Sequence, residues 1–196
     1  MPALEILIEN EYKRKGVHLL ALSIPIGYFF VSQRAALSIL IPVTLISVAF
    51  DFIRILNLPG HRILDYLFGP MLRAHEEIDL TGGSYILFAS TLCIFLFAKP
   101  VALAAIGFII LGDIFSAIVG RKYGKISFGD KTLEGSLGFF VACLLITVAV
   151  PDLALWVGVI GGLVAALVEA LDLPVDDNLA VPIVSGLIME LLLKIS

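Results

Sequence analysis

The chain is a series of long apolar runs separated by short polar breaks. Runs of this length predict helices that cross a bilayer, although several are shorter than the ~20 residues that a full crossing needs. These shorter helices are expected to borrow polar flanking residues or to lie where the bilayer is thinned. The pattern therefore predicts an all-α fold, a polytopic membrane helical bundle with about seven transmembrane helices. The seven runs lie at residues 16–33, 35–56, 81–98, 101–119, 135–150, 153–171 and 179–194.

Composition excludes an ordinary soluble protein. Hydrophobic residues make up 60% of the 196 residues, with a mean hydropathy of +1.06, whereas about half is usual in soluble domains. The short breaks leave no room for a soluble module, so we expect a single integral-membrane domain over residues 1–196, with 1–15 as an interfacial segment. No small-residue cleavage motif follows the first apolar run, so this run is expected to stay as a helix.

The basic residues are distributed unevenly between the two sides that seven spans would define. Ten of the 13 Lys and Arg residues fall on the side of the N-terminus, which the positive-inside rule makes cytoplasmic. These ten are Lys13, Arg14, Lys15, Arg54, Arg62, Arg73, Arg121, Lys122, Lys125 and Lys131, against Arg34, Lys99 and Lys194 on the other side. Acidic residues contribute little to orientation, yet only Asp152 and Glu190 fall on that other side. Their clustering predicts a polar site that faces the cytoplasm.

The first charged cluster precedes the first apolar run. Four of its residues have the spacing i, i+3, i+4 and i+7, so on a helix they would share one face. A group of charged residues at the membrane surface would explain the basic residues but not a histidine on the same face. A structural role at the membrane surface and a role in a functional site both stay open. The four residues are Glu11, Arg14, Lys15 and His18.

Two further polar groups flank the second and third runs. Asp51 and Arg54 lie one turn apart near the end of the second run and are expected to pair with each other. The long loop before the third run lies on the same side as the other polar clusters, so we expect it to form a wall of the site. Its polar residues are Arg73, His75, Glu76 and Glu77, ahead of Gly82 and Gly83.

Asp113 is the sharpest single candidate, because it lies about twelve residues into the fourth run. A carboxylate at that depth costs roughly 2.5–3.5 kcal/mol on insertion scales, and intramembrane ionisable residues are functional by default. A buried structural hydrogen bond is the alternative. Ser116 and Gly120 lie on the same helical face as Asp113. This face would therefore present a carboxylate and, two turns later, a glycine to the same neighbouring surface.

A glycine-rich basic loop follows the fourth run and is expected to hold phosphate. It is not a Walker A loop, because only three residues separate Gly120 from Gly124 where GxxxxGK needs four. Glycines nonetheless let main-chain amides approach an anion, and basic side chains supply charge. Thr132, Glu134 and Ser136 would place polar groups around the next helix N-terminus, which favours phosphate. The basic residues of the loop are Arg121, Lys122, Lys125 and Lys131.

An acidic cluster separates the last two runs. Glu169 lies near the end of the sixth run, and Asp172, Asp176, Asp177 and Asn178 follow. Asn178 could cap the last helix and a neighbouring aspartate could favour its positive end, but capping alone does not require four acids around one turn. Carboxylate and amide oxygens are suitable ligands for Mg²⁺, which also binds phosphate oxygens.

Taken in order, these blocks resemble the CTP-dependent lipid kinase family, which includes dolichol kinase, phytol kinase and the yeast-type diacylglycerol kinase. Each block is weak alone, but the blocks are specific in this order and with this hydropathy. The resemblance runs from Glu11 to Pro182, and the length is close to that of compact prokaryotic members. The blocks are ExxRKxxH at 11–18, RxHE with a later TG at 73–82, GDIFSAIVGRKYGK at 112–125, KTxEGS at 131–136, and Glu169 with DNxxxP at 177–182.

The resemblance implies a kinase that transfers the γ-phosphoryl group of CTP to the hydroxyl of a membrane alcohol, with Mg²⁺ as cofactor, at the cytoplasmic face. The preference for CTP over ATP follows from the resemblance alone, and no nucleic acid is implied as a partner. Catalytic roles fall to Asp113, His18, Lys15 and Arg14, and metal binding to Asp113, Glu134, Glu169 and Asp177. Nucleotide binding falls to Gly120, Arg121, Lys122, Gly124, Lys125, Lys131, Thr132, Glu134, Gly135, Ser136, Asn178, Arg73 and Glu76.

Several alternatives stay open. The acceptor could be a polyprenol such as dolichol, a shorter alcohol such as geranylgeraniol or phytol, or diacylglycerol. A CTP-using phosphatidate cytidylyltransferase, or CDP-lipid synthase, is the alternative enzyme, and it would release pyrophosphate rather than CDP. A transporter is less favoured, because the non-cytoplasmic side is nearly bare of charge and no inverted repeat is visible. Gly158 and Gly162 form a GxxxG pattern, interpreted first as a helix-packing face and also as a contact for a homodimer.

Overall fold

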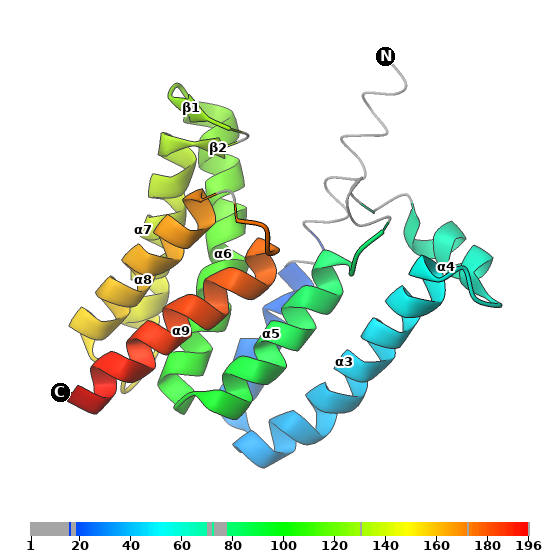
Figure 1. The fold of residues 1–196 in the computed structure, drawn as a ribbon. Helices are drawn as coiled ribbons and strands as arrows, with labels where there is room; N and C mark the ends of the chain where they lie inside the picture. The colour runs from blue at the N-terminus through cyan, green and yellow to red at the C-terminus, as the bar shows by residue number, and fades with distance from the viewer. Residues whose placement is uncertain are drawn as a thin grey trace.

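The protein is a bundle of helices that run roughly side by side (Figure 1). In the computed structural model the described residues are 16, 19–69, 72, 78–129, 131–171 and 173–195. Two two-residue strands, β1 and β2, form a small antiparallel ladder that pairs Ser127 with Thr132 and Phe128 with Lys131. The elements are α2 (Ser23–Phe30), α3 (Gln33–Ile55), α4 (His61–Phe68), α5 (Gly82–Leu96), α6 (Lys99–Tyr123), β1 (Ser127–Phe128), β2 (Lys131–Thr132), α7 (Leu133–Ala149), α8 (Leu155–Ala170) and α9 (Asp177–Ile195).

The seven apolar runs all form helices, which confirms the prediction of a membrane helical protein. Three helices, α3, α6 and α9, are long and apolar enough to cross a bilayer, while α5, α7, α8 and the segment Leu19–Phe30 are shorter apolar helices. Two features were not predicted. The short helix α4 lies in the connection between α3 and α5, and the β1–β2 ladder lies within the region expected to be an irregular loop. The orientation of the bundle in a membrane stays a prediction.

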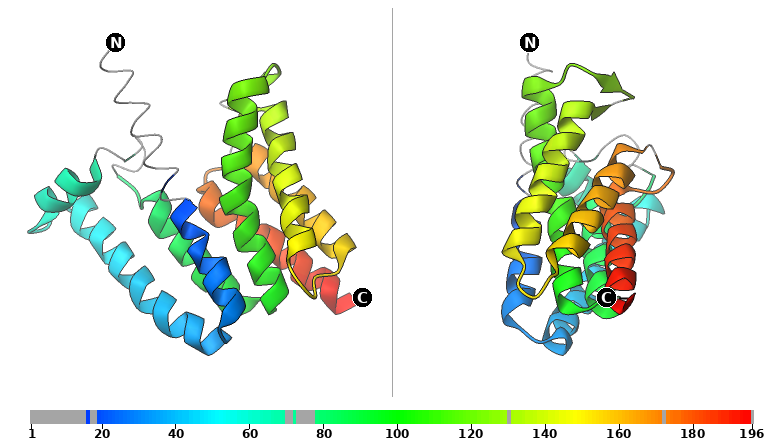
Figure 2. Two further views of the ribbon diagram at one scale, coloured as in Figure 1. Left: turned by 180° about the vertical axis from the view of Figure 1, so that it is seen from behind. Right: turned by 90° about the vertical axis from the view of Figure 1, so that its left-hand side faces the viewer.

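Helix α6 is the centre of the bundle. Every residue from Val101 to Ile110 is buried, as expected for a helix that is apolar on all sides and enclosed by other helices. It packs against α2, α5, α7, α8 and α9, and the two views from behind and from the side show it between these neighbours (Figure 2). Helix α3 lies at one edge, where it packs mainly against α5. Asp113 lies three residues beyond this buried stretch and is itself half-buried.

Small residues let α7 and α8 approach closely. A Cβ atom at Gly158 would lie 2.7 Å from the Oγ1 atom of Thr147, and one at Gly162 would lie 2.8 Å from the Cβ atom of Cys143. The GxxxG pattern is therefore a packing face within the chain, as first predicted. Because α7 already occupies this face, the expectation of a homodimer contact through these two glycines is wrong.

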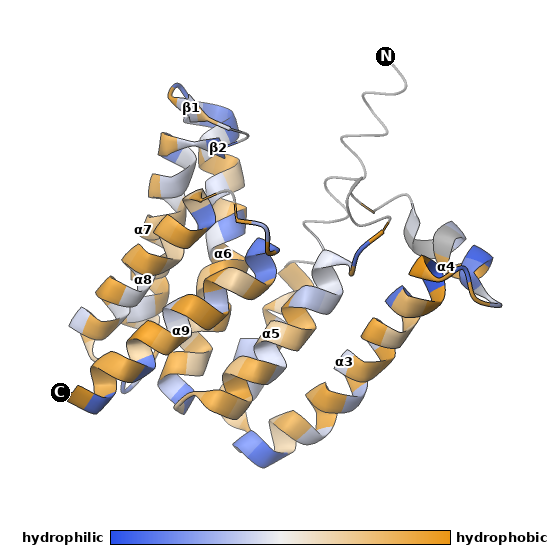
Figure 3. Cartoon of the chain, in the orientation of Figure 1, coloured by the Kyte–Doolittle hydropathy of each residue, from blue (hydrophilic) through white to orange (hydrophobic). Residues whose placement is uncertain are grey.

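The two ends of the bundle differ in polarity. Figure 3 shows polar residues gathered at the end that carries the β1–β2 ladder and the N-termini of α5 and α9. At the opposite end two of the charged residues, Lys99 and Glu190, bind main-chain groups at helix termini. Lys99 donates from Nζ to the main-chain oxygens of Phe29 and Val31, at 3.0 and 2.9 Å. Glu190 accepts a 2.8 Å hydrogen bond from the main-chain nitrogen of Ala98, at the start of α6.

A buried polar network joins α3 to the start of α5. Arg54 donates from Nη2 to Asp51 Oδ1 at 3.4 Å, which confirms the predicted pair, and to the main-chain oxygen of Asp79 at 2.7 Å. Asp51 Oδ2 accepts from both the main-chain nitrogen and the hydroxyl of Thr81, at 2.9 and 3.1 Å. Thr81 in turn caps α5 by accepting from Ser84 N. The network fixes the turn before α5 to the buried side of α3.

A methyl group at position 158 is expected to destabilise the bundle. Thr147 is 2% exposed, and its hydroxyl donates to Cys143 O at 2.9 Å, so it has no room to turn away. We expect Gly158→Ala to lower the free energy of unfolding in mixed micelles by about 1–3 kcal/mol. Gly27→Ala is the matched control, because nothing lies within 4 Å of its added Cβ. Equal stability of the two variants would contradict the packing described for α7 and α8.

Removal of one partner of the Asp51–Arg54 pair is expected to cost far more than its hydrogen bond. Both side chains are about 5% exposed, so Asp51→Ala would leave a buried guanidinium without its carboxylate. Such losses are about 3–5 kcal/mol. The double variant Asp51→Ala/Arg54→Ala should lose less than the sum of the two single variants, because no charge is left uncompensated. Additive losses in a double-mutant cycle would show that the two charges are not coupled.

Candidate active site

Lys131 is the centre of a charged cluster at the polar end of the bundle. Its Nζ atom donates to Asp177 Oδ2 at 2.8 Å and to the main-chain oxygen of Glu169, and it lies 3.4 Å from Glu169 Oε1. The lysine comes from β2, Glu169 from the last turn of α8 and Asp177 from the first residue of α9. One ammonium group therefore connects the α6–α7 connection to the turn between α8 and α9.

The surroundings of Lys131 keep its ammonium group charged. Burial by itself lowers the pKa of Lys131, but the hydrogen bond to Asp177 and the charges of Glu169 and Asp177 act in the opposite direction. The net pKa is raised above its ordinary value, so the lysine is protonated at neutral pH. The cluster thus holds a permanent positive charge between two carboxyl groups.

Glu169 lies where four structural elements meet. It is 7% exposed, and besides Lys131 of β2 it faces two hydroxyl groups. Ser116 on α6 donates to Oε1 at 3.5 Å, and Ser136 on α7 donates to Oε2 at 3.4 Å. The carboxylate of Asp113, one turn before Ser116, is close enough to interact electrostatically with Glu169. The predicted residues Asp113, Ser136, Glu169 and Asp177 are therefore brought into one region with Lys131.

Glycines let α6 and α7 meet tightly beside this cluster. A Cβ atom at Gly120 would lie 2.9 Å from Thr132 Oγ1, and one at Gly135 would lie 3.1 Å from the main-chain oxygen of Ser116. A Cβ atom at Gly124 would clash with the main-chain oxygen of Gly120. These contacts give the three glycines a packing role, whereas their predicted contact with phosphate stays a prediction.

The basic loop is shorter than the sequence suggested. Helix α6 continues to Tyr123, so Arg121 and Lys122 lie in its last turn, where positive charge favours the helix C-terminus. Both side chains and that of Lys125 are exposed. Glu134 holds the loop in place, because its Oε2 atom accepts from the main-chain nitrogens of Lys125 and Ile126 at 3.0 and 3.3 Å. Glu134 thus anchors the loop. This contact was not predicted from the sequence, from which Glu134 was assigned to metal binding.

Two helix caps define the edges of the site. Thr132 caps α7, since its Oγ1 atom accepts from Gly135 N at 3.1 Å. At α9 the cap is Asp176, whose Oδ1 atom accepts from Asn178 N at 2.9 Å, so the suggestion that Asn178 itself caps this helix is wrong. Asn178 is instead inside the helix and 6% exposed. An aspartate is preferred as a cap because its carboxylate also favours the positive helix end.

The carboxylates of the site could serve as ligands of Mg²⁺ only in a site that the substrate completes. Within the described parts of the chain, no group of three or more His, Cys, Asp and Glu side chains is arranged to hold a metal ion. Mg²⁺ in phosphate-transfer sites needs fewer protein ligands, because one or two carboxylates act together with substrate phosphates and waters. The carboxylates of Glu169 and Asp177, which both contact Lys131 Nζ, fit that requirement.

Other predicted site residues lie outside the described residues. These are Arg14, Lys15 and His18 before the first helix, and Arg73 and Glu76 in the connection before α5. Their assigned roles stay predictions. The contact that sequence reasoning missed is the bridge from Lys131 to Glu169 and Asp177, since the lysine had been assigned to phosphate alone. No spacing signal could reveal it, because the bonded residues are 38 and 46 positions apart.

Comparison with known proteins supports the resemblance. The chain is 29% identical over 183 residues to an uncharacterised protein of Rickettsia prowazekii, covering 88% of this chain and 90% of the relative. It is 28% identical over 151 residues to CTP-dependent diacylglycerol kinase 1 of Schizosaccharomyces pombe, covering 67% and 69%. It is 26% identical over 207 residues to probable phytol kinase 2 of Glycine max, covering 95% and 67%.

No family model matches the chain, and no solved structure matches it. The relatives include proteins named as kinases of two lipid classes, diacylglycerol and phytol. The chain is therefore a distant homologue of proteins named as CTP-dependent diacylglycerol kinases and phytol kinases.

Proposed function

We propose that the protein transfers the γ-phosphoryl group of CTP to the hydroxyl of a membrane alcohol at the polar end of the bundle. The observation that carries the proposal is the Lys131 bridge, which gathers a permanent cation and two carboxyl groups around Asp113 and the start of α7. Phosphoryl transfer needs positioning and charge neutralisation rather than a covalent intermediate with the protein. The donor and the alcohol class are proposed from the named relatives.

The nucleotide would bind from the aqueous side. Arg121 and Lys125 are exposed at the polar end, and Lys131 lies two residues before the first residue of α7. Helix N-termini and basic side chains both attract phosphate. Lys131 would exchange its carboxylate partners for phosphate oxygens when the nucleotide binds. Glu169 and Asp177, the carboxylates that Lys131 would release, would hold Mg²⁺, which neutralises the phosphate charge when bound.

The acceptor alcohol would approach from the apolar side. Asp113 lies ten residues before the end of α6, about 15 Å deeper than Tyr123 at ~1.5 Å per residue. A lipid hydroxyl would reach this carboxylate from within the bilayer, and the γ-phosphoryl group of the nucleotide would reach it from the aqueous side. Asp113 would accept the hydroxyl proton as the new oxygen–phosphorus bond forms and the bond to the β-phosphate oxygen breaks, which releases CDP.

The first test concerns the carboxylate. Asp113→Asn preserves shape but cannot accept the proton, so we expect kcat to fall by about 10²–10⁴ while the thermal midpoint changes little. Asp152→Asn is the control, because Asp152 lies at the opposite end of the bundle, with φ 60°, a conformation that asparagine also tolerates. Wild-type turnover by folded Asp113→Asn protein would remove Asp113 from the reaction.

The second test concerns nucleotide binding and needs no turnover. Magnesium CTP should raise the thermal midpoint of the wild-type protein, and Lys131→Met should reduce that rise because a phosphate partner is lost. A tenfold weaker affinity removes ~1.4 kcal/mol of ligand stabilisation at saturating nucleotide. Lys194→Met, near the C-terminal end of α9, should keep the full rise. Lys131→Arg retains the charge and should recover part of it, which separates lost binding from a damaged fold.

A further inference from the structure

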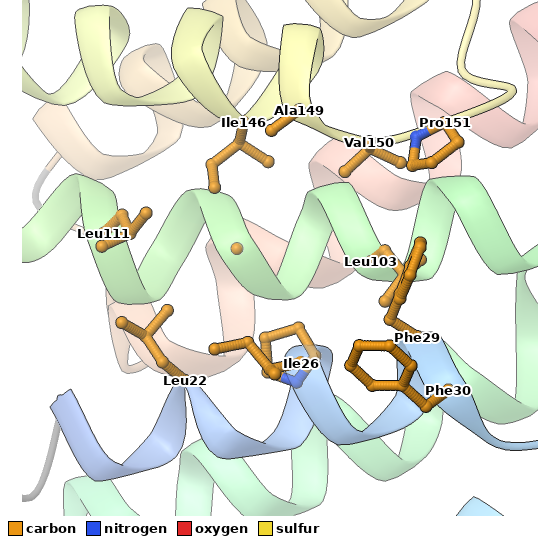
Figure 4. A pocket seen from close by; sticks show the side chains of 12 residues that line it. Leu22, Ile26, Phe29, Phe30, Leu103, Leu111, Ile146, Ala149, Val150 and Pro151 are labelled. Atoms are coloured by element: carbon orange, nitrogen blue, oxygen red, sulfur yellow. The ribbon is translucent and has the colours of Figure 1, made fainter.

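An apolar groove runs along α6 between α2 and α7 (Figure 4). Its volume is about 430 Å³, within the range of pockets that bind small molecules. All twelve lining residues are apolar. A groove with such walls provides no hydrogen bond to a polar ligand, so its ligand must be a hydrocarbon chain.

The groove has two distinct ends. Leu22 and Leu111 lie at one end, and Phe30, Leu103 and Pro151 lie at the other (Figure 4). Leu103 and Leu111 are eight residues apart on α6, so the groove extends for about 12 Å along the helix at ~1.5 Å per residue. Leu111 is two residues before Asp113 on the same helix. One end of the groove therefore lies at about the depth of Asp113. Residues two apart leave a helix on nearly opposite faces, so the acceptor hydroxyl would turn around α6 from the groove to meet this carboxylate.

The walls are shaped by specific side chains rather than by loose packing. Gly107 lies on the floor, and a Cβ atom there would come within 3.1 Å of Ile146 Cγ2. The absence of a side chain lets α7 close over the middle of the groove. At the far end Phe29 and Phe30 meet edge to face, with ring centroids 5.0 Å apart. These contacts shape a groove whose walls come from α2, α6 and the end of α7.

We propose that this groove binds the hydrocarbon chain of the acceptor alcohol, specifically the segment nearest its hydroxyl. The inference rests on the proposed kinase function, because the acceptor must present its hydroxyl at the depth of Asp113. The groove is shorter than the ~30 Å hydrocarbon core, so it holds one chain segment and leaves the rest of a longer chain in the bilayer. The acceptor would enter laterally between α2 and α7.

Filling the groove should change chain-length preference. Ala149 on α7 lines the groove, whereas its neighbour Val148 is 76% exposed and does not line it. With isoprenoid alcohols of C10 and C20 as acceptors, Ala149→Phe should lower kcat/KM for the C20 alcohol about tenfold relative to the C10 alcohol. Val148→Phe should keep the wild-type ratio. An unchanged ratio in folded Ala149→Phe protein, or the same shift in both variants, would overturn the proposal.

A binding measurement separates failure of the groove from failure of the kinase function. A C20 alcohol with a photoreactive diazirine at its tenth carbon should label residues 146–151 in the wild-type protein, and Ala149→Phe should suppress that label. Labelling without any phosphorylation would keep the groove and reject the kinase. Phosphorylation with label spread over the lipid-facing surface, unaffected by Ala149→Phe, would keep the kinase and reject the groove.

Discussion

The salt-bridged contact of Lys131 with Glu169 and Asp177 is the interaction on which the polar end depends. Glu169 is almost fully buried among apolar helices, and a buried charge is stable only when it is paired and hydrogen-bonded. The lysine ammonium and the hydroxyls of Ser116 and Ser136 meet that requirement. Because the bonded groups come from β2, α6, α7, α8 and the start of α9, the same contact holds together the helix ends that form the proposed nucleotide site.

Charged residues have different roles at the two ends of the bundle, and only one end combines them into a candidate site. At one end, Lys99 and Glu190 form hydrogen bonds with main-chain groups at helix termini. At the other end, carboxylates, hydroxyls and basic side chains exceed what capping needs, and the apolar groove on α6 reaches the same depth from the opposite direction. A reaction between a charged nucleotide and a lipid requires this arrangement, in which one substrate comes from water and the other from hydrocarbon.

Local patterns in the sequence predicted much of the fold, whereas contacts between distant segments could not be predicted from them. Apolar runs located the seven helices because hydropathy is a property of each segment, and the Asp51–Arg54 pair followed from one-turn spacing. Helix α4 was missed because its eight residues carry several polar side chains. Gly120 and Gly135 looked like phosphate-binding glycines, yet their visible role is close helix packing, which depends on where Thr132 and Ser116 fold. The Lys131 bridge joins residues that only the tertiary fold brings together.

Product analysis with labelled nucleotide tests the central claim most directly. The purified protein in detergent would be given Mg²⁺, γ-labelled CTP or ATP, and a mixture of polyprenol, isoprenoid alcohols and diacylglycerol. The account predicts that label moves from CTP into one lipid while CDP is released. Release of pyrophosphate and formation of a CDP-lipid from phosphatidate, with no labelled lipid from the alcohols, would contradict it and identify a cytidylyltransferase instead.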